Sequence, residues 1–382
     1  MNKIEILSNL KNVKLIIGNG FDIHCGLHTS YKAFFDYLLK NKGDKLEQIQ
    51  KITSDKSLNI ETYKEIIKNI NVWDFYFYLV SKEDKSIQNL QWFDIESIIA
   101  NSLLEKDNPS NITYPKWKYV FIQGMNPTQN FCNPDLNTFF TNEKEKYEAK
   151  VRKLSLFYFL KNSKKEKYEW LLDELKKFEK EFGKFIDNEH RSNISTYTEA
   201  EKEFIDYLLP FFNINCIDTF NFGNFDLPTF DDLLFHINGN IEHPIFGIDS
   251  SVFKQSMPQS IFSKTNRRME LDMMFDDVSK TNKVKNLVIY GHSLTEPDYS
   301  YFFSMFDMIK LYKTSNDSKV IIAYSQYGKT SEENENIKSK LRESISKLFE
   351  EYSKYRGNIN QPQRFIEHLT LQHRLFLVEI PS

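Results

Sequence analysis

The chain has 382 residues, of which 40% are apolar, so it can bury a sizeable core in one large or two ordinary domains. Its 50 basic and 53 acidic side chains nearly cancel, which disfavours nucleic acid as a partner and leaves a small anionic ligand open. Three cysteines are too few for a disulfide framework or a cysteine-rich zinc site. Because no stretch of about 18 apolar residues predicts a membrane span, we expect a cytoplasmic protein without a membrane partner.

Six short apolar runs typical of buried strands follow one another along the chain. They lie at 13–17, 213–220, 233–237, 286–291, 318–324 and 374–380. Between the first and second runs the sequence is helical, from about 60 to 105 and again from about 143 to 209. In the second stretch apolar side chains recur at intervals of three and four residues, at Leu171, Leu175, Phe178, Phe182 and Phe185.

Strands separated by helical sequence predict a parallel sheet with helices on both faces. We therefore predict an α/β protein with a central, doubly wound sheet of the Rossmann-like type. Residues 1–58 and 210–382 are expected to form its discontinuous α/β core, and residues 59–209 a mainly helical insertion.

The first strand is followed by a turn with two glycines, Gly18 and Gly20. Glycine lets the backbone approach a ligand closely, and a turn between a strand and a helix is a usual place for phosphate. Ile23 stands where a dinucleotide-binding motif has its third glycine, which disfavours an ordinary Rossmann dehydrogenase. Thr29 or Ser30 is expected to cap the next helix. The alternative is a tight turn without a ligand.

Two histidines four residues apart, His24 and His28, have the spacing of metal ligands on one helix face. They lack a carboxylate or cysteine partner at a suitable spacing. We therefore predict no metal site.

Five segments form a more specific pattern together than any of them does alone. In chain order they are IGNGFDIHCGLHTSY (17–31), WFDIE (92–96), FNF (220–222), HINGNIEHPIFGID (236–249) and YGHSLTEPDYSYF (290–302). This pattern resembles the bacteriophage abortive-infection AbiH family across nearly the whole chain. The resemblance implies a phage-defence effector with a phage-derived trigger that the sequence does not identify.

The AbiH family is in turn similar, more distantly, to the SIR2-like NAD-binding fold. That similarity implies a phosphate turn after the first strand, an asparagine block beside the nicotinamide ribose, here Thr219-Phe220-Asn221, and a distal turn at the adenosine. The residues expected around the nucleotide are Gly18, Asn19, Gly20, Phe21, Asp22, Thr29, Ser30, Asn238, Gly239, Gly291, His292, Ser293, Leu294 and Asp298.

One position departs from the SIR2-like pattern. Where a catalytic His-Gly pair is expected, this sequence has Asn238-Gly239. His236 lies two residues earlier, on the same side of a strand and about 6 to 7 Å further back. It can still reach the pocket as a base, and it can equally be a partly buried histidine without a catalytic role.

The expected catalytic residues are Asn221, His236 and Asp22. Loss of nicotinamide from ribose passes through an oxocarbenium-like state, so an amide would hold the ribose and water, a neutral histidine would act as base, and carboxylates such as Asp22 and Glu96 would stabilise positive charge. Structural alternatives stay open: Asp22 as a turn cap, Glu96 as a helix surface acid and Asp298 as a helix N-cap.

The favoured function is an abortive-infection effector that binds NAD or a related nucleotide and hydrolyses it, as an NAD(P)+ glycohydrolase would. A nucleotide-binding sensor without turnover is the main alternative, since the His-Gly pair is missing. An effector acting on nucleic acid is the third. The sequence leaves open NAD against NADP, a homo-oligomeric state and the role of Trp92, Asp94 and Glu96.

Overall fold

The computed structural model describes most of the chain. The described residues are 10–51, 60–83, 92–103, 154, 157–158, 160–161, 165–223, 233–252, 256–270, 283–326, 330–357 and 362–381. The chain divides into two compact units. Unit 1 comprises Met1–Thr29, Gly183–Ile245 and Arg268–Ser382, and unit 2 comprises Ser30–Phe182 and Phe246–Arg267. The predicted limits of the helical insertion, at 58/59 and 209/210, stay a prediction.

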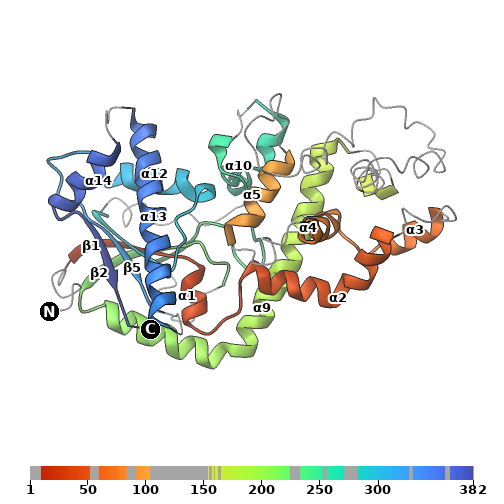
Figure 1. Ribbon diagram of the computed structural model, residues 1–382, viewed down its shortest axis with the longest axis horizontal. Coiled ribbons are helices and arrows are strands. Elements are labelled where there is room, and N and C mark those ends of the chain that lie inside the picture. The colour runs from red at the N-terminus through yellow and green to blue at the C-terminus, as the bar shows by residue number, and fades with distance from the viewer. Residues whose placement is uncertain are drawn as a thin grey trace. The chain divides into compact units, whose positions relative to one another are not determined.

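Unit 1 contains one six-stranded sheet in which all neighbouring strands are parallel (Figure 1). Its strands are β1 (Leu10–Ile17), β2 (Phe212–Thr219), β3 (Leu234–His236), β4 (Asn286–Tyr290), β5 (Val320–Tyr324) and β6 (Leu375–Glu379). The order across the sheet is β3-β2-β1-β4-β5-β6, as in Rossmann-like folds. All six predicted strands are therefore confirmed, together with the α/β class and the parallel, doubly wound sheet.

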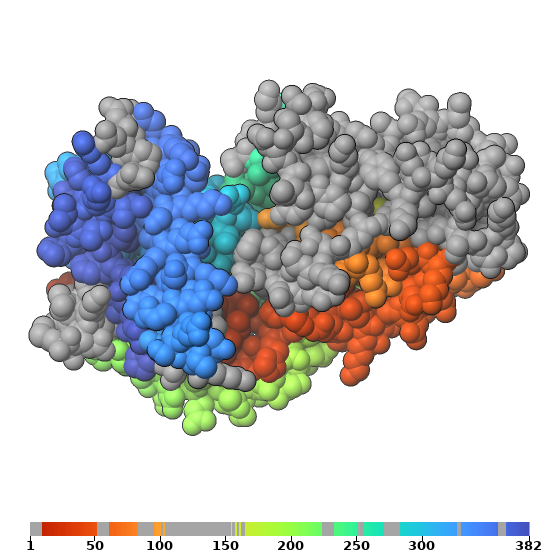
Figure 2. Space-filling model, viewed as in Figure 1, coloured from red at the N-terminus to blue at the C-terminus, as the bar shows by residue number. Residues whose placement is uncertain are grey.

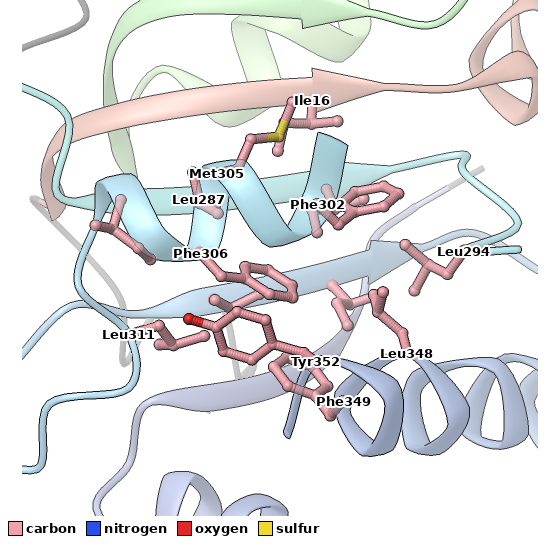
Figure 3. Close-up of a cluster of buried hydrophobic side chains, with 14 of the residues drawn as sticks. Ile16, Leu287, Leu294, Phe302, Met305, Phe306, Leu311, Leu348, Phe349 and Tyr352 are labelled. Atoms are coloured by element: carbon pink, nitrogen blue, oxygen red, sulfur yellow. The ribbon is translucent and has the colours of Figure 1, made fainter. Parts of the chain in front are cut away.

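Apolar side chains alternate between the two faces of this sheet. Leu15 and Ile17 of β1 contribute to one core, which the later part of α9 (Lys167–Leu208) covers. Ile16 contributes to the opposite core, which is closed by α12 (Tyr299–Met308), α13 (Ser331–Arg356) and α14 (Pro362–Leu371) (Figure 3). Both faces are buried, which explains why the strands read as continuous apolar runs.

Unit 2 is helical and has an aromatic core. Its described helices include α2 (Tyr31–Lys51), α3 (Ile60–Ile67), α4 (Val72–Glu83), α5 (Trp92–Leu103), the first part of α9 and most of α10 (Lys264–Met269). The Phe182 ring lies 5.0 Å from that of Phe34 and 4.9 Å from that of Phe246. The periodicity predicted for this part of α9 is confirmed, since Leu171, Leu175 and Phe182 are buried.

α13 shows clear end signals in sequence and structure. Thr330 and Glu333 form a reciprocal capping box at its N-terminus, and Gly357 ends it with φ 64°. Figure 2 shows this helix, coloured blue, on the surface of unit 1.

A buried ion pair links the two central strands β1 and β2. Lys14 Nζ lies 2.8 and 2.7 Å from the two carboxylate oxygens of Asp218, and both side chains are buried. Because each partner would be costly to bury alone, the pair favours the observed register of these strands.

Candidate functional site

The strand order reverses between β1 and β4, and open α/β sheets usually bind ligands outside the carboxyl ends of the strands at such a point. Here the turns that follow β1 and β4 are in direct backbone contact. Gly18 N–H donates to Tyr290 O at 2.9 Å, and Gly20 N–H donates to Gly291 O at 2.7 Å. A Cβ atom on Gly20 would lie 2.7 Å from Gly291 Cα. Both turns therefore need glycine for close packing.

The same contacts occupy amides that would otherwise face a ligand. In addition to Gly18 and Gly20, Phe21 donates its N–H to Gly18 O at 2.9 Å. The helix that follows, α1 (Asn19–His24), has only six residues. This packing accounts for both glycines without a ligand, and phosphate binding by the turn stays a prediction.

Asp22 is the buried acid of the site, with 2% of its surface exposed. Its Oδ1 accepts from Asn221 Nδ2 at 2.8 Å. Thr29 Oγ1 lies 3.2 Å from Oδ2 and 2.8 Å from Asn19 Oδ1, so its single hydroxyl proton is shared between these two acceptors. Tyr197 hydrogen bonds the same carboxyl. Burial raises the pKa of Asp22 to about 7, against the opposing effect of these hydrogen bonds. Its carboxylate thus binds side chains that come from distant parts of unit 1.

Two side chains of the β3 segment hold the turn after β2. His236 Nδ1 lies 3.1 Å from Asn221 O, and Asn238 Nδ2 donates to Phe220 O at 3.2 Å. A carbonyl oxygen only accepts, so His236 carries its proton on Nδ1 and its Nε2 has a lone pair. Burial lowers the pKa of His236, which keeps the ring neutral at neutral pH. His236 therefore has the tautomer and charge of a general base.

Asn221 and Asn238 also have side-chain oxygens that no described residue contacts by a hydrogen bond. Their Oδ1 atoms are buried and accept no hydrogen bond from the described residues, while the residues are 3% and 1% exposed. A buried acceptor without a partner costs about 1 to 3 kcal/mol. Such oxygens therefore favour a ligand or an ordered water that donates to them.

His292 is differently placed, in a buried corner after β4. Its Nδ1 accepts from Leu294 N–H at 2.9 Å, so the neutral ring carries its proton on Nε2, which lies 3.3 Å from Asp298 Oδ2. Its ring packs edge-on against Phe220, with centroids 4.4 Å apart. Leu294 adopts the left-handed conformation at φ 54°. Both nitrogens of His292 thus face protein groups, and Asp298 makes no side-chain cap at α12.

Two other predicted residues, Phe21 and Ser30, have contacts of their own. Phe21 is a core residue that packs against Tyr197, Phe204 and Tyr290. Ser30 lies in unit 2 and caps α2 by accepting from Ala33 N–H at 3.2 Å, so of the two predicted caps it is Ser30 that acts.

The structure also describes the surroundings of three further predicted residues, Gly239, Ser293 and Glu96. Gly239 has φ 80°, in the left-handed region, and Ser293 is exposed. Glu96 belongs to unit 2, where it is buried and paired with Lys264 Nζ at 2.9 Å. The interpretation of Glu96 as a surface acid is therefore wrong. Trp92 and Asp94 lie on the same helix, α5.

Sequence reasoning missed Tyr197 as a partner of Asp22. Tyr197 lies in α9 within a regular helical pattern, and no local motif distinguishes it from other core positions. Only the pairing of α9 with the sheet reveals the contact.

Within the described residues, no group of three or more His, Cys, Asp or Glu side chains could hold a metal ion. The helices of this same part of the chain include none that is both long and apolar enough to cross a membrane.

A family model described as bacteriophage abortive infection AbiH matches residues 15–322. Neither the curated proteins nor the solved structures gave a match. The matched stretch includes part of β1, all of β2 to β4 and part of β5, and so contains the turns and side chains of the site. The chain therefore belongs to the bacteriophage abortive infection AbiH family, which indicates a function in phage abortive infection.

Proposed function

We propose that this protein acts in abortive infection by binding NAD or a related nucleotide at the carboxyl ends of β1 to β3 and hydrolysing its nicotinamide–ribose bond. The observation that supports this most is the placement of Asn221 beside His236. Asp22 fixes the Asn221 amide through Nδ2, so Oδ1 is left to accept a hydrogen bond from a ligand. His236 is fixed by its Nδ1 contact with Asn221 O, so Nε2 is left to accept a proton.

These groups match what nicotinamide release requires. The nicotinamide of NAD is a pyridinium, so it leaves as a neutral molecule and needs no general acid. Water then adds to the ribose C1′ and loses one proton, which Nε2 of His236 takes up. Asn221 Oδ1 accepts from the water or a ribose hydroxyl, and ionised Asp22 stabilises the oxocarbenium-like charge. The products are nicotinamide, ADP-ribose and one proton.

The test is incubation of purified protein with NAD, with nicotinamide release as the measurement, in buffer and with extract of phage-infected cells that supplies a trigger. His236→Ala should lower turnover by about 10²- to 10⁴-fold. His236→Asn should lower it as much, although its side-chain amide can retain the hydrogen bond to Asn221 O. His368→Ala, on the exposed side of α14, is the matched control and should leave turnover unchanged.

The alternatives give different results. Wild-type protein that binds NAD and releases no nicotinamide under either condition would be a sensor, with Asn238 at the position of a lost catalytic histidine. If His236→Ala is harmless while Asn221→Ala abolishes turnover, another group is the base. Lack of nucleotide binding with measurable binding of nucleic acid would replace the proposal with the third alternative.

A further inference from the structure

Arg268, at the C-terminal end of α10, has a cationic side chain held by aromatic rings. Its guanidinium carbon lies 4.5 Å from the ring centroid of Phe235 and 5.8 Å from that of Tyr301. The side chain is half-buried, and no described residue forms a hydrogen bond or ion pair with it. Asp218, whose charge acts on Arg268, already binds Lys14 with both oxygens. The guanidinium thus makes cation–π contacts with two rings, while the described residues leave its N–H donors available.

The aromatic partners place Arg268 near the candidate site. Phe235 directly precedes His236 in β3. Tyr301 belongs to the first turn of α12, and its ring lies 6.1 Å from that of Phe220, which directly precedes Asn221. Arg268 therefore lies at the carboxyl end of β2 and β3. Because successive residues of a strand face opposite sides, a ligand that reaches both His236 and Arg268 passes over the end of β3.

A nucleotide needs a group that binds its phosphates. The amides of Gly18, Gly20 and Phe21 are engaged within the protein. Arginine suits the role, because its planar fork donates two parallel hydrogen bonds to a phosphate and stays charged at every relevant pH. Among the described residues Arg268 has no ion pair that would have to break, so it can provide such a fork.

We propose that Arg268 binds the phosphate groups of the nucleotide ligand. This inference rests on the proposed function, since it concerns the same ligand, but it requires only binding and no turnover. Phe235 and Tyr301 hold the guanidinium plane, and Arg268 thereby takes the role that the glycine turn has in ordinary dinucleotide-binding proteins.

The test compares the affinity of the full chain for two probes by calorimetry: NAD, which carries a pyrophosphate, and nicotinamide riboside, which carries no phosphate. Arg268→Gln should weaken NAD binding by about 10- to 100-fold, as expected for the loss of charged hydrogen bonds, and should leave riboside binding unchanged. Arg268→Lys should fall between, because it keeps the charge and loses the fork.

Arg356 supplies a matched control. Its guanidinium carbon lies 3.9 Å from the ring centroid of Tyr312, but it is already paired with Asp307 at 3.2 Å. Arg356→Gln should leave both affinities unchanged.

Unchanged NAD affinity in Arg268→Gln would overturn the inference, and so would an equal loss for NAD and the riboside, which indicates a structural role. Wild-type protein that binds neither probe would instead reject the proposed function, and the inference with it. Wild-type binding of both probes with a selective loss of NAD affinity in Arg268→Gln supports both.

Discussion

Two pairs of turns at the carboxyl end of one sheet use their residues in opposite ways. The turns after β1 and β4 pack backbone against backbone through Gly18, Gly20 and Gly291, and their amides and carbonyls bind one another. The turns after β2 and β3 meet through side chains, and the side-chain oxygens of Asn221 and Asn238 accept no hydrogen bond from the described residues. The first pair is closed, whereas the second has unused hydrogen-bonding capacity.

This difference shows that a glycine motif and a binding site need not coincide. The glycine spacing after β1 suggests a phosphate turn, yet in the structure Gly20 provides close contact between two segments. The turn after the neighbouring strand β2 instead contains Asn221, whose side-chain oxygen accepts no hydrogen bond from the described residues. A substitution in the glycine turn therefore tests folding, and Gly20→Val is a poor probe of nucleotide binding because its side chain would meet the Gly291 backbone.

The largest expected effect is a loss of stability in Gly291→Ala, which disrupts the packing between the turns after β1 and β4. The new Cβ would lie 2.5 Å from Phe21 N, and Gly291 has φ 69°. Overpacking and the left-handed backbone together should lower the free energy of unfolding by about 2 to 5 kcal/mol, measured by chemical denaturation. Gly43→Ala is the control, since a Cβ there meets nothing within 4 Å and alanine stabilises a helix interior. Equal stability of Gly291→Ala and wild type would show that the turns do not pack this way.

The second largest effect is a dependence of stability on pH, caused by Asp22. The pKa of Asp22 is raised from 3.8 to about 7 in the folded protein, so its contribution to stability is complete below pH 4 and is lost as pH rises towards 7. The loss over this range amounts to up to about 4 kcal/mol. Asp22→Asn removes this titration. The free energy of unfolding of the variant minus that of wild type should therefore be larger at pH 8 than at pH 5. Parallel pH profiles of the two proteins would contradict this.

A smaller effect is expected from Thr29→Val, which keeps the shape of the side chain and removes its hydroxyl. Thr29 stabilises the ionised form of Asp22, so its loss should raise the Asp22 pKa further. It should also cost about 1 kcal/mol of stability. NMR titration of the Asp22 carboxyl measures the first effect, and a downward shift would contradict the hydrogen bond.

The smallest effect separates the two histidines by tautomer. In its neutral form the His236 ring should carry its proton on Nδ1, because Nδ1 faces a carbonyl oxygen. The neutral His292 ring should carry its proton on Nε2, because its Nδ1 accepts from an amide N–H. Nitrogen-15 NMR of the imidazole rings distinguishes the two forms. The same tautomer at both positions would show that one of these contacts is absent in solution.

The sequence was sufficient to predict the sheet because parallel strands are buried on both faces and appear as apolar runs. Asn221 and His236 follow or end such runs, as the sequence indicates, and their catalytic role stays a prediction. The sequence did not reveal the partner of Gly20, which lies after β4, or the pairing of Glu96 with Lys264. Arg268 likewise has no local motif, because its role depends on rings from β3 and α12. Contacts between distant segments carry no periodic signal.

The buried pair of Lys14 and Asp218 has a consequence for synthesis of the chain. β1 lies in the middle of the sheet, yet the partner of Lys14 follows 204 residues later. At 5 to 20 residues per second, β1 waits roughly 10 to 40 s on the ribosome for β2. During that time an apolar strand without neighbours is prone to aggregate, and a lysine within it works against such association. We therefore expect the charge that later pairs with Asp218 to limit association of the nascent chain first.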